Sequence, residues 1–240
     1  MVFKSLPFLP KACLGIDVGT SYLKVVELSQ WGDRRKLKNY GELRATALYN
    51  KPFRTFEKNT LLFSNKDIAR ALKSILQEAG IKTKKAVFSL PDFSSFFTNF
   101  ELPPMSQSEL TQAVEYEARK HVPLPFSEIT LDWQVVDGKF AEKKPSRILI
   151  VAVPNEIVEK YNRIAQMAEI EFENMELETF SSARALVKDE SVPTVILDVG
   201  SRTTNISIID QGIVVLHHNI DTGGAALTRI LSRGMAIDSN

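Results

Sequence analysis

Two copies of one short pattern constrain the fold of this chain more than any other feature of its sequence. The first copy is LGIDVGTSYLKVVEL, at 14–28, and the second is VILDVGSRTTNISIID, at 195–210. In each copy an apolar strand ends in Asp-Val-Gly, hydroxyl side chains follow, and a strand with alternating apolar residues returns. Each copy predicts a β-hairpin with a tight turn. Two related hairpins in one chain predict two related α/β units.

Each turn has the chemistry of a phosphate site, although a single turn of this kind is more often an ordinary hairpin. Backbone N–H groups that face outward together bind anions, and glycine lets the backbone approach a ligand closely. Carboxylates hold hydrated Mg²⁺, so we assign Asp17 and Asp198 to a metal. The hydroxyls that can add hydrogen bonds are those of Thr20, Ser21, Ser201, Thr203 and Thr204. No Gly-x-x-x-x-Gly-Lys-Ser/Thr pattern occurs, so a Walker-type loop is excluded.

Composition excludes several functional classes. The 30 basic and 29 acidic residues nearly cancel, so no strong field attracts nucleic acid or an anionic membrane. Cys13 is the single cysteine, which rules out an internal disulfide and fits a reducing compartment. No apolar run approaches the ~20 residues that a spanning helix needs, and MVFKSLPFLPK is too short for a signal peptide. We therefore expect a cytoplasmic protein that does not bind nucleic acid.

Periodicity predicts strands and helices that alternate along the chain. Strands are expected as a pair over 12–29 and singly over 36–45, 85–91, 94–102, 129–136, 147–154 and 171–177. Helices are expected over 66–79, after a capping box from Ser106 to Glu109, after an N-cap at Asn155, and over 179–186. The similar strands KAVFSLP and RILIVAVP frame a unit with its own helix and strands. This framing predicts an inserted subdomain.

Histidine and cysteine patterns do not favour other chemistry. His217 and His218 are adjacent on an expected strand, so their side chains point to opposite faces and cannot share one metal. No Ser/His/Asp or Cys/His nucleophile arrangement is indicated.

Several stretches of the sequence resemble a known superfamily. DVGTSYLK resembles the first phosphate motif of actin–Hsp70–FtsA proteins, and DVGSRTTNISI resembles the second. Leu90–Val136 and IDTGGAALTRIL, at Ile220–Leu231, are similar to the PilM family of type IV pilus assembly proteins within it. The resemblance implies an α/β, actin-like (RNase H-like) fold with an incomplete second lobe. The implied parts are a first lobe over 12–85 and 159–190, an inserted subdomain over 86–158, and the start of the second lobe over 191–240.

The resemblance also implies an ATP site with Mg²⁺. Lys24 stands seven positions after Asp17, where actin-like proteins place a phosphate-contacting lysine, and Glu178 matches the residue that orients the attacking water. The implied ligands of the nucleotide and metal are Asp17, Gly19, Thr20, Ser21, Lys24, Asp198, Gly200, Thr203, Thr204, Gly223 and Gly224. The later adenosine motif of the family is absent from this chain. We therefore expect at most a slow ATPase.

The implied partner is a PilN-like inner-membrane protein, and the resemblance leaves self-association open. Its short apolar N-terminal peptide is expected in a groove between the KAVFSLP and FSSFFTNFEL strands and the first lobe. This interaction would place the chain at the inner face of the inner membrane, with membrane contact only through the partner. The alternative is a sugar-kinase-like or exopolyphosphatase-like phosphotransferase of the same superfamily. The aromatic and proline-rich stretches FSSFF and PLPF favour peptide contact instead.

Overall fold

A computed structural model describes most of the chain, as residues 12–31, 34–48, 52–53, 55–57, 60–62, 64–137 and 145–237. The stretch 1–11, which is too short for a signal peptide, lies outside the described residues. Within the described ranges, no helix is long and apolar enough to cross a membrane.

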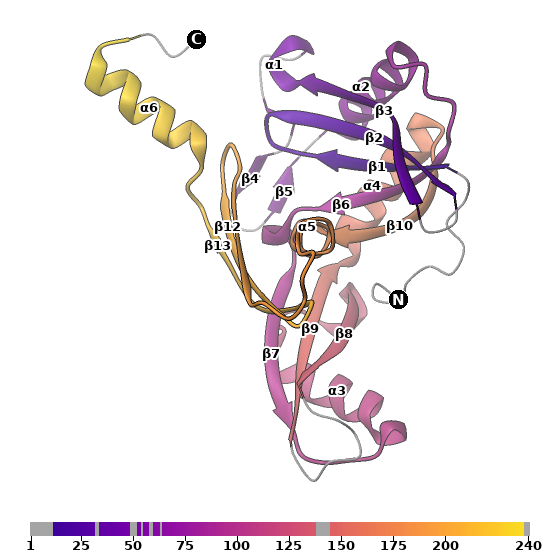
Figure 1. The fold of residues 1–240 in the computed structure, drawn as a ribbon, viewed down its shortest axis with the longest axis vertical. Helices are drawn as coiled ribbons and strands as arrows, with labels where there is room; N and C mark the ends of the chain where they lie inside the picture. Colours follow the sequence, from indigo (N-terminus) through magenta and orange to yellow (C-terminus); the bar gives the residue numbers. More distant parts are fainter. Residues whose placement is uncertain are drawn as a thin grey trace.

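A mixed five-stranded sheet forms the first lobe (Figure 1). Its order is β10-β6-β1-β2-β3, with β6 parallel to both β1 and β10 and the β1-β2-β3 part antiparallel. The bounds are Ala12–Val18 for β1, Tyr22–Trp31 for β2, Arg34–Arg44 for β3, Lys85–Leu90 for β6 and Glu171–Leu177 for β10. The expected pair over 12–29 is thus the β1–β2 hairpin, and its turn lies at the edge of the cavity described below.

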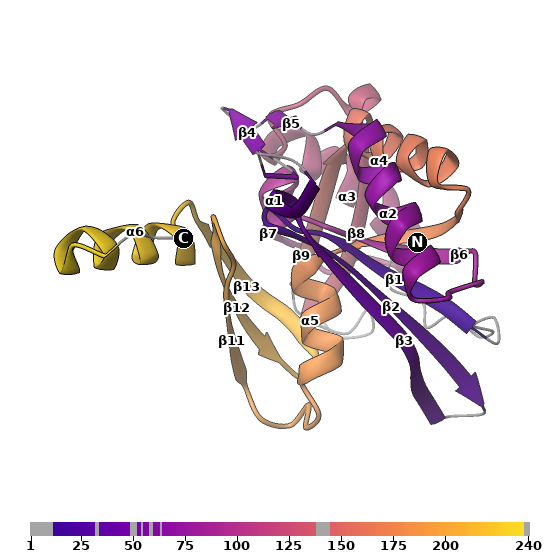
Figure 2. The same cartoon turned by 90° about the horizontal axis from the view of Figure 1, so that it is seen from above.

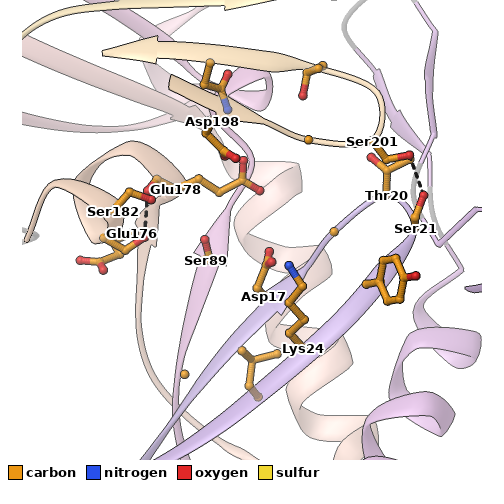
Figure 3. Close-up of a pocket in the computed structure, with 18 of the residues that line it drawn as sticks. Asp17, Thr20, Ser21, Lys24, Ser89, Glu176, Glu178, Ser182, Asp198 and Ser201 are labelled. Atoms are coloured by element: carbon orange, nitrogen blue, oxygen red, sulfur yellow. Dashed lines mark hydrogen bonds between the residues drawn. The ribbon is translucent and has the colours of Figure 1, made fainter. Parts of the chain in front are cut away.

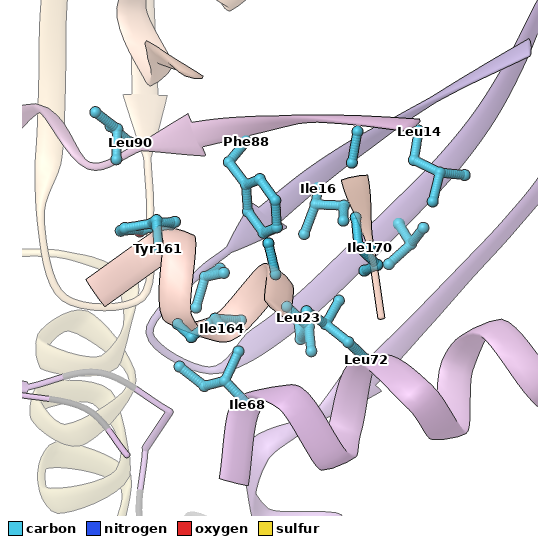
Figure 4. Packing of buried hydrophobic residues seen from close by; sticks show 14 of the residues in the cluster. Leu14, Ile16, Leu23, Ile68, Leu72, Phe88, Leu90, Tyr161, Ile164 and Ile170 are labelled. Carbon is cyan, nitrogen blue, oxygen red and sulfur yellow. The ribbon is translucent and has the colours of Figure 1, made fainter. Parts of the chain in front are cut away.

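Two helices, α2 (Asn65–Glu78) and α4 (Asn155–Ala168), cover one face of this sheet (Figure 4). Ile68 and Leu72 of α2 and Tyr161 and Ile164 of α4 are buried against it, at the spacing of one helical face. α2 ends before Gly80, which has a φ of 63°. The smaller elements of this lobe are α1 (Ala45–Leu48), β4 (Thr55–Glu57) and β5 (Thr60–Leu62).

The inserted subdomain is an antiparallel sheet of order β7-β9-β8 with one helix on it. Its elements are η1 (Asp92–Ser94), β7 (Phe96–Leu102), α3 (Gln107–His121), η2 (Phe126–Glu128), β8 (Ile129–Asp137) and β9 (Ser146–Pro154). The predicted capping box starts α3, with Ser106 and Glu109 bonded to each other. Ile148 and Ile150 of β9 pack in the cluster under α3, while Leu149 and Val151 join the core of the first lobe. A strand buried on both faces explains the unbroken apolar run.

Two sequence predictions need correction here. The boundary expected at 86 falls inside β6, which is bonded to β1 and β10, and the boundary at 158 falls inside α4, which packs on α2. The inserted unit therefore spans η1 to β9. Asn155 is not the N-cap, because Pro154 occupies that position and Asn155 is the first helical residue. The Asn155 side chain instead bonds to the Ser127 carbonyl and the Thr130 hydroxyl.

The second lobe begins with an antiparallel three-stranded sheet of order β11-β12-β13. Its strands are β11 (Thr194–Val199), β12 (Thr204–Asp210) and β13 (Ile213–Ile220), and α6 (Gly224–Met235) follows. The helix α5 (Glu178–Leu186) lies between this sheet and the first lobe and contacts both (Figure 2). α5 is thus the element that joins the two lobes.

Candidate functional site

The two predicted hairpins face each other across a cavity of about 450 Å³ (Figure 3). This volume lies within the range of small-molecule sites in proteins. The cavity walls come from the β1–β2 hairpin, β6, the β10–α5 corner and the β11–β12 hairpin. The predicted site residues that line it are Asp17, Gly19, Thr20, Ser21, Lys24, Glu178, Asp198, Gly200 and Thr203. We call this cavity the nucleotide cleft, after the ligand that the sequence predicts for it.

The first hairpin brings a carboxylate and an ammonium group to one wall of the cleft. Asp17 and Lys24 are opposite each other in the β1–β2 ladder, and both side chains point into the cavity (Figure 3). Their neighbours Val18 and Leu23 point the other way and are buried in the core. At the turn, a Cβ on Gly19 would lie 2.7 Å from the carbonyl oxygen of Tyr22. The turn therefore requires glycine.

The second hairpin repeats this arrangement with one change. Asp198 is opposite Asn205 at the same seven-residue spacing, so an amide stands where the first hairpin has an ammonium group. Asn205 is buried, lines the cleft and accepts a hydrogen bond of 2.5 Å from Asn219. Sequence analysis missed Asn205, although its spacing from Asp198 was a usable signal.

A direct hydrogen bond joins the two hairpins at the cleft. The Ser21 hydroxyl donates to the Ser201 hydroxyl at 2.7 Å, across 180 positions of sequence (Figure 3). Both hydroxyls line the cavity. Two turns with this separation can bind one polyphosphate from both sides.

Three predicted ligands lie beside the cleft without lining it. Thr204 donates to the Thr222 carbonyl at 2.7 Å and so ties β12 to the segment before α6. A Cβ on Gly223 would lie 2.5 Å from the Gly200 carbonyl oxygen, and Gly224 N–H donates to that oxygen at 2.8 Å. In this structure Thr204, Gly223 and Gly224 support the second hairpin, and a direct contact with nucleotide stays a prediction.

Carboxylates at the β10–α5 corner form the remaining wall. Glu178, the first residue of α5, extends into the cleft on the side of Asp198 (Figure 3). Glu176 lies just before it and accepts a two-pronged ion pair from Arg184, with one N–O distance of 2.8 Å. This pair fixes the end of β10 against α5.

The donor set suits a magnesium–phosphate group rather than a metal alone. Asp17 and Asp198 provide carboxylate oxygens from opposite hairpins, and Lys24 adds a cation for phosphate oxygens. Within the described parts of the chain, no cluster of three or more His, Cys, Asp or Glu side chains could hold a metal. Mg²⁺ is commonly bound by one or two carboxylates, with waters and substrate phosphates completing its shell. The two aspartates therefore fit the predicted cofactor.

A small apolar groove lies on the other side of the β10–α5 corner. Its volume is about 60 Å³, which suits an apolar side chain rather than a whole small molecule. Its lining residues are Leu90, Thr130, Asp132, Val151, Val153, Val158, Met175, Glu176, Leu177 and Phe180. These come from β6, β8, β9, α4, β10 and α5, so the groove lies between the first lobe and the inserted subdomain. The insert contributes β8 and β9 here, whereas the sequence analysis expected the strand now identified as β7.

A buried polar cluster lies where the three parts of the chain meet. The Thr179 hydroxyl donates to Asp92 at 2.9 Å and lies 3.0 Å from His217 Nδ1 and 3.2 Å from the Ser207 hydroxyl. Asp92, Thr179 and Ser207 are buried. Burial lowers the pKa of His217 to about 4, and the nearby His218 adds to this effect. Sequence analysis considered His217 only as a metal ligand, because its partners are distant in sequence.

The lowered pKa of His217 predicts a pH dependence of stability. The unfolded chain binds a proton at His217 near pH 6.5, whereas the folded chain resists protonation until about pH 4. Between these values the unfolded state holds more protons, so the free energy of unfolding falls as pH falls. A His217→Gln variant should lose less stability over this window, by at most about 1 kcal/mol per pH unit after allowing for solvent screening. Urea unfolding at pH 4 to 7 gives the slope of the unfolding free energy against pH for the wild type and for His217→Gln. Identical slopes would contradict the lowered pKa of His217.

The comparison with protein families decides the relationship. The family model described as type IV pilus assembly protein PilM matches residues 15–240. The chain belongs to the PilM family. This match confirms the predicted resemblance to the PilM family.

Solved structures show the same fold at low sequence identity. A structure described as a PilM-PilN type IV pilus biogenesis complex matches with a TM-score of 0.76 and 20% identity, covering 94% of this chain and 66% of that one. The ethanolamine utilization protein EutJ from Carboxydothermus hydrogenoformans matches with a TM-score of 0.54 and 16% identity, covering 97% and 60%. The cytoplasmic domain of EpsL, an inner membrane component of the type II secretion system of Vibrio cholerae, matches with a TM-score of 0.55 and 10% identity, covering 95% and 78%. The predicted actin-like α/β fold is confirmed, and the chain spans about two thirds of the PilM relative.

Proposed function

We propose that this chain is a nucleotide-binding scaffold of the type IV pilus assembly platform. It binds Mg²⁺–ATP between the two hairpins and a short apolar N-terminal peptide of a PilN-like membrane protein in the apolar groove. Its place is the cytoplasmic face of the inner membrane, where it is held through that partner. Membership of the PilM family and the groove between first lobe and insert support this function together.

The groove is the single observation that carries the peptide assignment. Its lining includes the buried apolar side chains of Leu90, Val151, Val153 and Phe180. An extended peptide points alternate side chains to one face, so one apolar side chain can enter while its neighbours stay in solvent. The polar lining residues Thr130, which is exposed, and Asp132 belong to β8 and can meet the polar backbone of such a peptide. The PilM relative above was solved in a complex with PilN, which supports the choice of partner.

The nucleotide assignment rests on the paired hairpins. Lys24 and the turn around Gly19 suit phosphate oxygens, while Asp17 and Asp198 suit the metal. Bound Mg²⁺ would neutralise phosphate charge between the two lobes. The Ser21–Ser201 hydrogen bond supports a shared ligand, because it brings the two turns together at the cleft.

Isothermal titration calorimetry tests the proposed function. A synthetic peptide with the apolar N-terminal sequence of the cognate PilN-like protein should bind with a stoichiometry of one, and ATP with Mg²⁺ should bind to the same chain at a separate site. A scrambled peptide with the same composition is the control, because it keeps the hydrophobicity and changes the spacing. Equal binding of both peptides, or no binding of either, would contradict the proposal.

Glu178 gives a separate prediction about hydrolysis. If the carboxylate orients water, it acts on the transition state more than on bound ATP. Glu178→Ala should then lower ATP turnover by a factor of about 10² or more and change ATP affinity by less than about twofold. Phosphate release and calorimetry measure the two effects. Glu173→Ala, on β10 and outside the cleft lining, is the control and should keep turnover. An equal loss of affinity in Glu178→Ala would make Glu178 a ligand-contacting residue instead.

A further inference from the structure

The β10–α5 corner is a wall shared by the nucleotide cleft and the apolar groove. Glu178, Ser181 and Ser182 of α5 line the cleft, at the spacing of one helical face. Phe180 points to the other side and lines the groove, and Glu176 borders both. Any rotation or shift of the first turn of α5 therefore moves side chains in both sites at once.

Asp92 holds this first turn from outside the helix. Its two carboxylate oxygens accept from the Thr179 backbone N–H at 3.3 Å and from the Thr179 hydroxyl at 2.9 Å. The first N–H groups of a helix have no partner within it, and a carboxylate suits them electrostatically. Asp92 is also the first residue of η1, which leads from β6 into the inserted subdomain. The start of α5 is thus tied to the entry of the insert.

The same Thr179 hydroxyl is tied to the second lobe. Its one hydrogen goes to Asp92, so a hydrogen bond with Ser207 of β12 or His217 of β13 has that residue as the donor. The Ser207 hydroxyl also lies 3.1 Å from His217 Nδ1. The His217 ring also packs on Phe97 of β7, with 5.4 Å between ring centroids. One buried hydroxyl therefore joins the helix, the insert and the second lobe.

Strand β12 connects the second hairpin to the Thr179 hydroxyl. Thr203 and Asn205 line the cleft, and Ser207 follows on the same face of β12. A ligand that draws the second hairpin toward the first must carry Ser207 with it. The Ser207 and Thr179 hydroxyls lie 3.2 Å apart in the buried cluster, so movement of Ser207 has to be followed by α5 or has to break this contact.

We propose that Thr179, held by Asp92 and Ser207, is a positioning residue that couples the nucleotide cleft to the apolar groove. The proposal rests on the function proposed above. Nucleotide in the cleft fixes the first turn of α5, which fixes Phe180 in the arrangement that accepts the peptide. By linkage, peptide tightens nucleotide binding by the same factor.

The test measures peptide affinity with and without a saturating non-hydrolysable ATP analogue and Mg²⁺. In the wild type the analogue should tighten peptide binding by about fivefold or more. The coupling ratio is the peptide affinity with the analogue divided by the peptide affinity without it. Thr179→Val keeps the shape and removes the hydroxyl, so it should reduce this ratio to less than about twofold while each ligand still binds alone. Thr179→Ser keeps the hydroxyl and should keep the ratio. Ser207→Ala removes one partner, offers a second variant if Thr179→Val does not fold, and should lower the ratio.

The outcomes separate this proposal from the proposed function. If both ligands bind to the wild type and the ratio is one, the coupling is refuted and the proposed function stands. A coupling ratio equal to that of the wild type in folded Thr179→Val or Ser207→Ala also refutes the coupling. If neither ligand binds, the proposed function fails, and the positioning role is judged by amide hydrogen exchange over 176–186. Faster exchange in both variants than in Thr179→Ser supports that role, and unchanged exchange overturns it.

Discussion

Replacing Asp17 or Asp198 by alanine is expected to weaken Mg²⁺-dependent ATP binding by about tenfold or more. Each change removes one of the two carboxylates that face the cleft from opposite hairpins. Charge-assisted interactions of this kind contribute about 1.5–3 kcal/mol each. When Mg²⁺ is chelated the loss should turn into a small gain of affinity, because a carboxylate without the metal only repels phosphate. Calorimetry with Mg²⁺ and with EDTA measures both conditions.

Two further variants show whether the loss is specific. Lys24→Ala should weaken ATP binding by about 1–3 kcal/mol with and without Mg²⁺, since the ammonium contacts phosphate directly in the proposed complex. Asp210→Ala removes a carboxylate at the far end of β12, outside the cleft lining, and should bind as the wild type does. Wild-type affinity in both Asp17→Ala and Asp198→Ala would remove the metal assignment.

Placing a charge in the apolar groove is expected to abolish peptide binding. Val158 lines the groove from α4 and is only partly buried, so Val158→Asp can leave the fold intact. A carboxylate there has to be desolvated when an apolar side chain enters, which costs about 2 kcal/mol or more. Peptide affinity should therefore fall by about thirtyfold or more, while ATP affinity is unchanged. Calorimetry with each ligand measures the two effects.

The matched control lies on the same helix. Met167 is exposed on α4 and does not line the groove, so Met167→Asp should keep wild-type peptide affinity. Thermal unfolding should show both variants folded. If folded Val158→Asp binds the peptide normally, the partner site lies elsewhere.

Local sequence patterns predicted the hairpins and the boundaries of most helices correctly. Asp17 and Asp198 end apolar strands and precede short turns, so the chemistry is contained in a few adjacent residues. The capping box at Ser106 is equally local and was confirmed. Asn155 failed as a cap because Pro154 already sets the extended geometry before the helix, and the amide finds partners from η2 and β8.

Strand pairing was the feature of the fold that could not be predicted from the sequence. KAVFSLP and RILIVAVP are similar apolar runs, yet β6 is bonded within the sheet of the first lobe and β9 within the sheet of the insert. β9 is buried on both faces, whereas β6 buries one face and lines the cleft with the other. Their similar apolar composition does not reveal which strands they pair with. The inserted boundaries were therefore placed inside β6 and α4 instead of at η1 and the end of β9.

Sites formed by segments distant in the sequence could not be predicted from the sequence. The apolar groove needs side chains from six elements, and none of these elements carries a motif of its own. The Thr179 cluster combines a helix start with residues from η1, β12 and β13, and its polar residue types occur everywhere on protein surfaces. Only the folded arrangement shows that these groups are buried together.

Methyl NMR of the chain labelled at methionine measures peptide docking most directly. Met175 lines the groove, whereas Met105 belongs to the inserted core and Met167 and Met235 are exposed elsewhere. On titration with the PilN-like peptide, the Met175 signal should shift and saturate at one equivalent, and the signals of Met167 and Met235 should stay in place. Saturable binding that leaves the Met175 signal unmoved would contradict the proposed peptide site.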